Sequence, residues 1–279
     1  MARRWLITGC SSGLGLALAA AVAGAGDEVV ATTRRPGALA ALSGEFPGQV
    51  TEAVVDVRDA GQCRAAVDLA VERLGGVDVL VNNAGSGLFG AVEEVTDDEL
   101  RGQLEVLVVA PWRLTRQVLP LMRARGGGHI VNVSSLAGRM AFPGLSAYTA
   151  GKYALEGMSQ ALAAEAGPFG IRVTVLEPGG FATRYGFSLV EAATRIPAYA
   201  DAVDPMMAQL RGMEHNGELN RPEDFAAQVL RAVTADSVPL RLPVGEDAFG
   251  FLAFAQSAAE EELAAAREFA RAVVPGPRS

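Results

Sequence analysis

The sequence predicts an α/β protein with one doubly wound sheet, and three observations lead to that prediction. Short runs rich in valine, isoleucine and leucine alternate with helix-like stretches along the chain. A glycine-rich turn follows the first run, and no linker, repeat or low-complexity segment divides the chain. Buried parallel strands joined by right-handed crossovers produce this alternation. We therefore expect residues 1–279 to form a single domain.

Seven runs have the composition of strands. They are RWLIT (4–8), EVVATT (28–33), TEAVV (51–55), VDVLV (77–81), HIVNV (129–133), IRVTVL (171–176) and PLRLP (239–243). Helices are expected near residues 14–25, 59–74, 97–125, 146–166 and 222–235. This order predicts a seven-stranded parallel sheet with helices on both faces.

Two segments lie outside this alternation. The stretch 184–221 has no strand period and follows the sixth strand, at the sheet edge where ligands bind in such folds. Its aromatic and methionine content favours a mobile substrate lid over an ordinary surface excursion. The residues concerned are Tyr185, Phe187, Met206, Met207 and Met213. The tail from about 246 to 274 is predicted to be an amphipathic helix that covers a core edge or a partner subunit.

The composition argues against several classes of function. Hydrophobic residues make up 50% of the 279 residues and charged residues 20%, which is typical of a globular protein with a sizeable core. The net charge of −8 argues against nucleic acid or an anionic membrane as a partner. No apolar run reaches the ~18 residues of a membrane span. A small molecule is the expected partner.

The chain offers little for metal or histidine chemistry. Cys10 and Cys63 form no CxxC pair and suit a reducing compartment, so we expect a cytoplasmic protein. A metal cluster or a catalytic triad would have to draw on His129 or His215, the two histidines. We therefore expect no metal.

The N-terminus has the composition of a secretory signal, with paired arginines before an apolar stretch. Glycines and serines between residues 9 and 15 interrupt that stretch where a signal core should be continuous. The same residues match a nucleotide-binding turn, which cleavage would destroy. We expect them to belong to the folded domain.

The turn TGCSSGLG (8–15) lies between the first strand and the first helix, and it predicts a nucleotide site. Glycines permit a tight turn and close approach of the backbone, and the N-terminus of a helix favours a pyrophosphate. An ordinary turn with a serine N-cap is the competing interpretation. The residues expected to contact the nucleotide here are Gly9, Ser11, Ser12, Gly13, Leu14 and Gly15.

The end of the second strand indicates which dinucleotide binds. An NAD-preferring site has an acid about 20 residues after the turn, where it receives the ribose hydroxyls. Thr33 takes that place here, and Arg34 and Arg35 follow. Two guanidiniums suit a 2′-phosphate, at about 1.5–3 kcal/mol per charged hydrogen bond. NADP(H) is the predicted cofactor, and a solvated arginine pair is the alternative.

A single lysine stands among 24 basic residues, in the segment YTAGK (148–152). Tyr148 and Lys152 are spaced i and i+4, so they share one face of a helix. A surface pair would be served equally well by arginine, whereas lysine offers a compact ammonium with three rotatable donors. An ammonium beside a phenol stabilises the phenolate. The pair therefore predicts acid–base chemistry.

Together these motifs resemble the short-chain dehydrogenase/reductase family, most closely from residue 4 to about 183. TGCSSGLG is similar to the family's cofactor turn, and NNAG (82–85) to its motif after the fourth strand. SS (134–135), YTAGK and PGGFAT (178–183) are similar to its catalytic serine, its Tyr-x-x-x-Lys and its nicotinamide-side loop. The resemblance is closest to reductases of bulky ketones, of the hydroxysteroid dehydrogenase sort. It implies a Rossmann fold and a homodimer or homotetramer.

The resemblance also implies roles. Tyr148 would give a proton to the carbonyl oxygen as hydride arrives from the nicotinamide, Ser135 would hold that oxygen, and Lys152 would bind the ribose hydroxyls. Further residues implied to contact the cofactor are Asp56, Val57, Asn83, Ala84, Gly85, Pro178, Gly179, Phe181 and Thr183. Residues implied to line a pocket for a bulky apolar or polycyclic ketone are Leu88, Phe89, Met140, Phe142, Leu145, Tyr185 and Phe187. Ordinary core packing is the alternative for several of these.

One position departs from the family's pattern. Leu107 stands where the family usually has an asparagine, which helps to distort a helix so that a backbone carbonyl holds a water reaching the lysine. Leucine favours an unbroken helix, which would remove that water. Pro111 has no N–H, however, so the Leu107 carbonyl lacks its i+4 partner. We favour an active enzyme whose proton relay runs through that carbonyl.

Three functions are compatible with these residues. The favoured one is an NADPH-dependent carbonyl reductase or alcohol dehydrogenase with Tyr148 as general acid. Leu107 points toward a cofactor-binding sensor or scaffold without turnover, and the intact Ser135, Tyr148 and Lys152 weigh against it. The third is an epimerase or dehydratase on the same fold.

Overall fold

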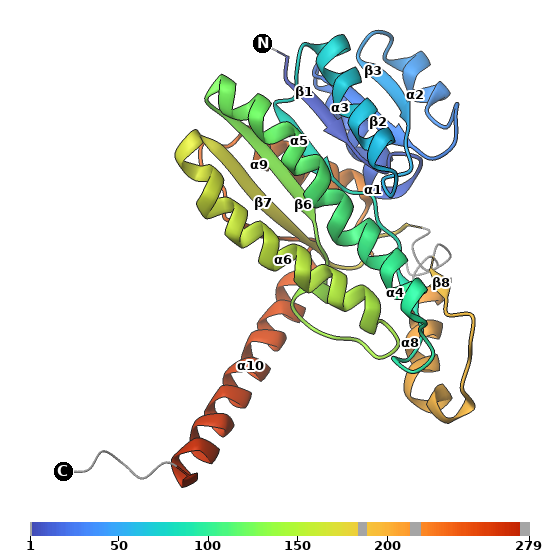
Figure 1. Cartoon of the computed structure of the whole chain (residues 1–279), viewed down its shortest axis with the longest axis vertical. Coiled ribbons are helices and arrows are strands. Elements are labelled where there is room, and N and C mark those ends of the chain that lie inside the picture. The colour runs from blue at the N-terminus through green and yellow to red at the C-terminus, as the bar shows by residue number, and fades with distance from the viewer. Residues whose placement is uncertain (1, 184–188, 213–218, 274–279) are drawn as a thin grey trace, which may run out of the picture.

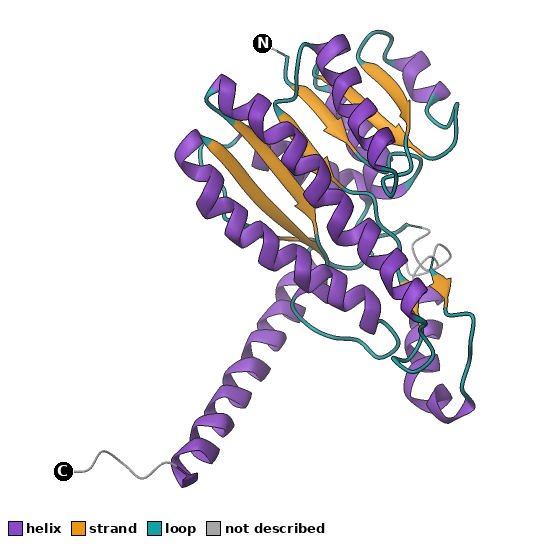
Figure 2. Cartoon of the chain, viewed as in Figure 1, coloured by secondary structure: helices purple, strands orange, loops and turns teal. Residues whose placement is uncertain are grey.

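The computed structural model describes residues 2–183, 189–212 and 219–273, and a seven-stranded parallel sheet lies at its centre (Figures 1 and 2). The order is β3-β2-β1-β4-β6-β7-β9. The strands are β1 (Arg4–Ile7), β2 (Glu28–Thr33), β3 (Val50–Val54), β4 (Val79–Asn82), β6 (Gly128–Val133), β7 (Ile171–Pro178) and β9 (Arg241–Val244). The predicted doubly wound fold is confirmed. The strand order reverses between β1 and β4, where ligands bind in such sheets.

Helices cover both faces of this sheet (Figure 1). On one face α1 (Gly13–Gly24) packs beside α9 (Pro222–Thr234). The other face carries α3 (Ala60–Leu74), α5 (Ala110–Arg125) and α6 (Ser146–Ala166), and α2 (Ala40–Glu45) lies beside β3. The helix predicted over 97–125 is α4 (Asp97–Leu104) and α5 joined by a π-helical turn, η1 (Glu105–Val109). Short 3₁₀ turns are η2 (Leu136–Gly138), η3 (Gly167–Phe169) and η4 (Pro197–Tyr199).

Residues at the helix ends set these boundaries. The Asp59 carboxylate caps the N-terminus of α3, and Thr96 forms a reciprocal capping box with Glu99 at the start of α4. Gly75 ends α3 with φ +78°, and Gly126 ends α5 with φ +74°. Glycine adopts this left-handed conformation without a Cβ clash, so each helix ends there.

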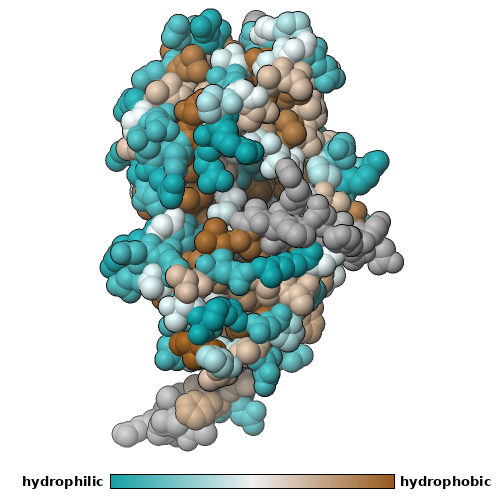
Figure 3. Space-filling model, turned by 90° about the vertical axis from the view of Figure 1, so that its right-hand side faces the viewer, coloured by the Kyte–Doolittle hydropathy of each residue, from teal (hydrophilic) through white to brown (hydrophobic). Residues whose placement is uncertain are grey.

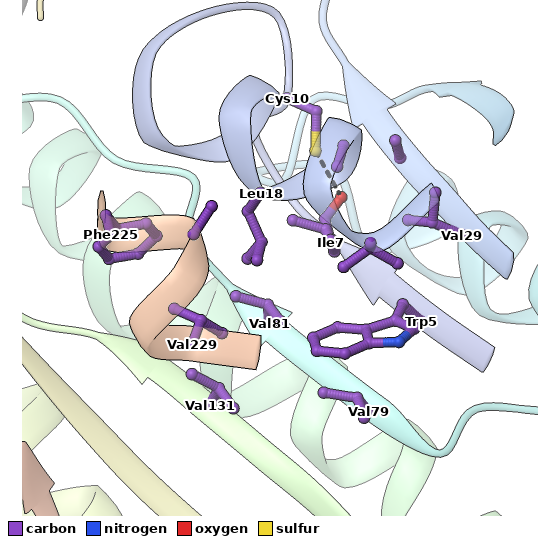
Figure 4. Close-up of a cluster of buried hydrophobic side chains, with 14 of the residues drawn as sticks. Trp5, Ile7, Cys10, Leu18, Val29, Val79, Val81, Val131, Phe225 and Val229 are labelled. Carbon is purple, nitrogen blue, oxygen red and sulfur yellow. Dashed lines mark hydrogen bonds between the residues drawn. The ribbon is translucent and has the colours of Figure 1, made fainter. Parts of the chain in front are cut away.

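Apolar side chains fix α1 and α9 on the sheet (Figure 4). Trp5, Leu18 and Phe225 are fully buried in this cluster, and each such side chain contributes about 1.5–3 kcal/mol by burial. The Trp5 indole N–H donates to the Asp27 carboxylate at 2.9 Å. Phe225 also contacts the Phe181 ring edge-to-face at 6.0 Å between centroids. The N-terminus of α1 and the loop after β7 are therefore held on one rigid core.

The insertion after β7 has structure of its own. In the described part, β8 (Val190–Glu191) pairs in parallel with β5 (Leu88–Phe89), and α8 (Ala200–Gly212) follows. Figure 1 shows this unit beside α4, away from the main sheet. Of the residues predicted for the lid, Tyr185, Phe187 and Met213 lie outside the described residues.

The tail forms α10 (Glu246–Val273), which projects away from the rest of the molecule (Figure 1). Its first turn is fastened, because the Asp247 carboxylate accepts from the Gly180 N–H at 2.7 Å and Ala248 is buried. Residues 256–271 are all exposed. The expectation that the tail covers a core edge is therefore wrong over most of its length. Among the described helices, none combines the length and apolarity needed to cross a membrane.

Candidate active site

A cavity of about 710 Å³ opens at the carboxyl edge of the sheet. The ends of β1, β2, β3, β4, β6 and β7 contribute to its lining, together with α6. Every residue predicted to contact the cofactor lines it except Arg35, which is exposed outside it. Ser135, Tyr148 and Lys152 line the same cavity. The fold thus brings the nucleotide-type turn and the catalytic candidates together.

The glycine turn between β1 and α1 is shaped for close approach of a ligand. Gly9 and Gly13 have φ of +75° and +57°, which L side chains rarely adopt. A Cβ on Gly15 would come within 2.4 Å of the Gly9 carbonyl oxygen. Ser12 is the N-cap of α1 by position, but its side chain makes no capping hydrogen bond, and the first turn holds no acid. The turn and the helix N-terminus therefore fit a pyrophosphate.

The NNAG segment closes this turn onto β4. The Thr8 hydroxyl oxygen accepts from the backbone N–H groups of Asn83 and Ala84, each at 3.0 Å. The Asn83 side-chain amide donates to the carbonyl oxygens of Thr8 at 2.8 Å and Gly9 at 3.1 Å. These bonds fix the glycine turn against the neighbouring strand.

A buried polar chain links β4, β6 and α6 below the cavity. The Asn82 amide donates to the Asn132 side-chain oxygen at 2.8 Å, and the Asn132 amide donates to the Ser159 hydroxyl at 2.8 Å. The Ser159 hydroxyl donates in turn to the Leu155 carbonyl at 2.6 Å. Buried polar groups held this way specify one arrangement of neighbouring elements, here the register of α6 on the sheet.

The adenine end of the cavity is lined by charged side chains. Arg34 lines it with its exposed side chain. Arg58, a residue with no role predicted from the sequence, also lines it and pairs with Asp56 at 2.6 Å. The hydrogen bond from Arg58 lowers the pKa of Asp56, the charge of Arg34 helps to lower it, and Asp56 stays ionised. The sequence did contain a signal for Arg58, because a basic residue stands two places after Asp56, which was predicted to contact the cofactor.

Tyr148 and Lys152 lie one turn apart on α6, and both are buried. The Lys152 ammonium donates to the Val133 carbonyl at the end of β6, at 2.8 Å, and lies 5.5 Å from the centroid of the Tyr148 ring. A Cβ on Gly85 would stand 3.8 Å from the ammonium nitrogen, at ordinary van der Waals distance. The carbonyl bond holds the lysine beside the phenol.

Ser135 follows β6 and begins η2. Its hydroxyl oxygen accepts from the Ala137 N–H at 3.2 Å, and the residue is partly buried. Because that oxygen is already an acceptor, its own hydrogen is suited to point elsewhere, into the cavity that Ser135 lines.

Buried ion pairs lie behind this serine. Arg139, directly after η2, contacts Glu177 at 3.0 Å, and Arg241 contacts Glu156 at 2.9 Å. Glu177 and Glu156 are almost fully buried, and burial raises the pKa of Glu177. The network ties the serine loop to α6, β7 and β9, so the elements that carry the catalytic candidates share one support.

The helix at Leu107 is distorted. Residues 105–109 form a π-helical turn, and the Ala110 N–H donates to the Glu105 carbonyl five residues back. The Leu107 side chain is buried, and its atoms lie 2.8 Å from the place a Cβ on Gly151 would take. The alternative of an unbroken α-helix is therefore wrong, because the π turn shifts the hydrogen-bond register before Pro111.

The residues predicted for the substrate pocket fall into four groups. Leu88 lines the cavity. Phe89 and Leu145 are buried in a cluster with Tyr148 and Met207 of α8, and Phe142 packs against that cluster. Met140 is partly buried outside the cavity lining, and Tyr185 and Phe187 lie outside the described residues. On the face that carries α8, apolar residues are scattered among polar ones (Figure 3).

The described part of the insertion is fastened to the body. Glu94, fully buried, accepts from the Ile196 N–H at 2.7 Å and pairs with Arg195 at 3.5 Å. The backbone bond from Ile196 is the main cause that lowers the pKa of Glu94. The Glu99 carboxylate accepts from the Ala193 N–H at 2.9 Å. The described part of the insertion therefore forms a fixed side of the site. Movement of the insertion as a lid stays a prediction.

His129 is buried away from the cavity. Its Nε2 lies 2.8 Å from the Thr174 hydroxyl, and burial lowers its pKa to about 3. It stays neutral and takes no part in the cavity lining. His215 lies outside the described residues, and the described residues contain no cluster of metal-binding side chains.

Comparison with known proteins agrees with this site. Residues 3–193 match the short chain dehydrogenase family. Oxidoreductase BOA17 of Botryotinia fuckeliana is 40% identical over 89% of this chain and 90% of its own length. The 3-ketodihydrosphingosine reductase of Bacteroides thetaiotaomicron is 35% identical over 86% of this chain and 87% of its own. A short-chain dehydrogenase of Streptomyces avermitilis superposes with a TM-score of 0.89 and 40% identity, over 98% of both chains.

The fold and the site define an α/β oxidoreductase. The chain belongs to the short-chain dehydrogenase/reductase family.

Proposed function

We propose that this chain is an NADPH-dependent ketoreductase that acts on a bulky hydrophobic carbonyl substrate in the cytoplasm. The observation that carries the proposal is that the buried Tyr148–Lys152 pair lines the same cavity as the glycine turn and Arg34. One cavity thus combines residues suited to a nucleotide with a tyrosine that can act as an acid.

The residues of the cavity suit a nicotinamide dinucleotide. The glycine turn offers backbone N–H groups to a pyrophosphate, and Arg34 offers a guanidinium to a 2′-phosphate. Lys152 uses one N–H on Val133 and has two more to donate to ribose hydroxyls. A bound NADPH would supply the hydride.

The protein residues would handle the proton. Ser135 would donate its hydroxyl hydrogen to the substrate carbonyl oxygen and orient it. Tyr148 would transfer its phenolic proton to that oxygen as the C–H bond forms, which leaves a neutral alcohol and a phenolate. The Lys152 ammonium would stabilise the phenolate at short range in a buried site. Water held by the Leu107 carbonyl would return the proton.

The apolar surroundings favour a bulky ketone. Leu88 and Val190 line the cavity next to the cluster that contains Phe89 and Met207. The relative from Bacteroides thetaiotaomicron reduces a keto group on a dihydrosphingosine, which is in line with such a substrate. We therefore place the substrate among large apolar or polycyclic ketones.

The test follows NADPH absorbance with a panel of ketones of increasing apolar size. We expect turnover that improves with size, and a loss of about 10²–10⁴-fold in Tyr148→Phe, which removes the proton donor and little packing. NADPH binding without oxidation by any ketone would favour a sensor or scaffold. Conversion of a substrate without net change in NADPH would favour an epimerase or dehydratase.

A further inference from the structure

The loop between β2 and α2 carries both arginines that the sequence predicts for a 2′-phosphate. Arg34 and Arg35 are exposed, and only Arg34 lines the cavity. Exposed arginines lose much rotamer freedom on binding, by about 2 kcal/mol for a fully fixed side chain. A loop that already holds its backbone in place reduces the further cost of aiming Arg34 at a phosphate.

One carboxylate from the neighbouring strand closes this loop. Glu52 of β3 accepts from the backbone N–H of Gly37 at 3.1 Å and of Ala38 at 3.0 Å. The Thr33 hydroxyl lies 2.9 Å from the same carboxylate and 2.8 Å from the Arg35 carbonyl oxygen. Both ends of the segment 33–38 are thus held by one side chain and one hydroxyl.

Glu52 itself is not a ligand candidate. It is partly buried and does not line the cavity, and both of its oxygens are used by the loop. Bonds from backbone N–H groups to an ionised carboxylate are about twice as strong as neutral ones. The carboxylate therefore acts on the loop and not directly on the nucleotide.

We infer that Glu52 is a positioning residue that sets the preference for NADP(H) by holding the loop on which Arg34 stands. The inference rests on the proposed function, since it requires that Arg34 binds the 2′-phosphate. It also predicts an effect of the Glu52 charge opposite to that of simple electrostatics. Removal of an acid near a phosphate should strengthen phosphate binding by simple electrostatics, whereas loss of the loop geometry should weaken it.

The experiment measures dissociation constants of NADPH and NADH for the full chain and its variants. Glu52→Gln keeps the size of the side chain but places an amide N–H against a loop donor. We expect NADPH binding to weaken about 5- to 20-fold and NADH binding to change by less than about twofold. Thr33→Val, which loses the hydroxyl at the other end of the loop, should act in the same direction.

A double-mutant cycle separates positioning from general damage. If Glu52 works through Arg34, then Glu52→Gln should cost almost nothing further in an Arg34→Ala background. Glu45→Gln is the matched control, because Glu45 is an exposed acid at the end of α2. It should leave both dissociation constants unchanged.

Three outcomes would overturn the inference: NADPH binding that is unchanged or stronger in Glu52→Gln, equal weakening of both nucleotides, or full additivity with Arg34→Ala. Equal affinity of the unmutated protein for NADPH and NADH is a different result, since it would overturn the proposed cofactor itself. The first measurement therefore tells the two failures apart.

Discussion

The Lys152 ammonium occupies a narrow place between β6 and the segment after β4. It donates to the Val133 carbonyl at 2.8 Å and stands over Gly85, with 5% of the residue exposed. We expect Lys152→Arg to fold but to lose at least about tenfold in turnover, because the wider, planar guanidinium cannot take this position. The measurement is kcat at saturating NADPH, with thermal unfolding as the control for folding. Near-normal turnover would show that charge alone suffices and that the choice of lysine is incidental.

We expect Arg34 to set the cofactor preference of this site. We expect NADPH to bind at least about tenfold more tightly than NADH, and Arg34→Ala to remove most of that difference, since one charged phosphate contact is worth about that much. Titration with each nucleotide checks this. Arg35→Ala provides the comparison: Arg35 lies outside the cavity lining, so its loss should matter less. A larger effect of Arg35→Ala would reverse the assignment.

At the level of elements, the π turn η1 contains Leu107, and Pro111, four residues later, has no N–H to donate to the Leu107 carbonyl. Pro111→Ala restores an N–H at that position. If the proton relay uses the Leu107 carbonyl, the new donor should compete for it and lower kcat about tenfold, with little change in NADPH binding. Leu114→Ala, further along α5 and also buried, serves as a control for general loss of packing. Unchanged kcat in Pro111→Ala would exclude this carbonyl from the relay.

The pair of strands β6 and β7 contains a group that destabilises the fold in acid. The pKa of His129 is lowered from 6.5 to about 3, mainly by burial, so the folded state keeps it neutral. The stability from this group is present above pH 6.5 and is lost as the pH falls toward 3. Between about pH 7.5 and pH 5, His129 should cost about 2 kcal/mol. His129→Gln keeps a partner for Thr174 and should lose about that much less over the same interval in urea unfolding. Identical losses would mean that the histidine is protonated in the fold.

The seven long strands could be predicted because buried parallel strands are continuous apolar runs. The strands β5 and β8 pair with each other and span two residues each, which is too short for an alternating pattern to be detected in the sequence. The π turn was also missed, since an extra residue in one helical turn leaves the apolar pattern from 97 to 125 intact. The direction of α10 depends on which surface it meets, and its sequence does not contain that information.

The site shows the same division. Motif residues such as Gly9 and Tyr148 could be placed because their spacing along the chain is fixed by one turn or one helix. Glu52 could not, because its role comes from partners on another segment. Arg58 was missed although its partner Asp56 lies only two residues away. Sequence spacing predicts what a single element presents, and tertiary contacts decide what it is held against.

For the whole molecule, α10 is the feature that a single chain leaves unexplained. It runs for 28 residues, about 42 Å, with Phe254 and Leu263 exposed at 68% and 52%. We propose that it lies against a second subunit, as expected for a homodimer or homotetramer. Light scattering should show an oligomer for the full chain, and Phe254→Glu with Leu263→Glu should lower its mass.

A matched control adds the same charge without touching apolar residues. Gln256→Glu with Ser257→Glu places two acids on exposed polar positions of the same helix. This variant should keep the oligomer. Dissociation by both pairs would point to helix charge rather than to apolar contact, and dissociation by neither would place the interface elsewhere.

Because the chain has a single lysine, chemical modification of that side chain can report on the active site. An amine-reactive reagent has a single side-chain target in this chain, because every other basic side chain is arginine. That target is 5% exposed and lines the cavity, so a reagent must enter the cavity to acylate it. The mass added to the peptide that contains Lys152, counted over time and apart from any mass on the N-terminal amine, would then measure access to the active site. A nucleotide lying over Lys152 should slow that count, so cofactor binding can be followed at one side chain of the unmutated protein.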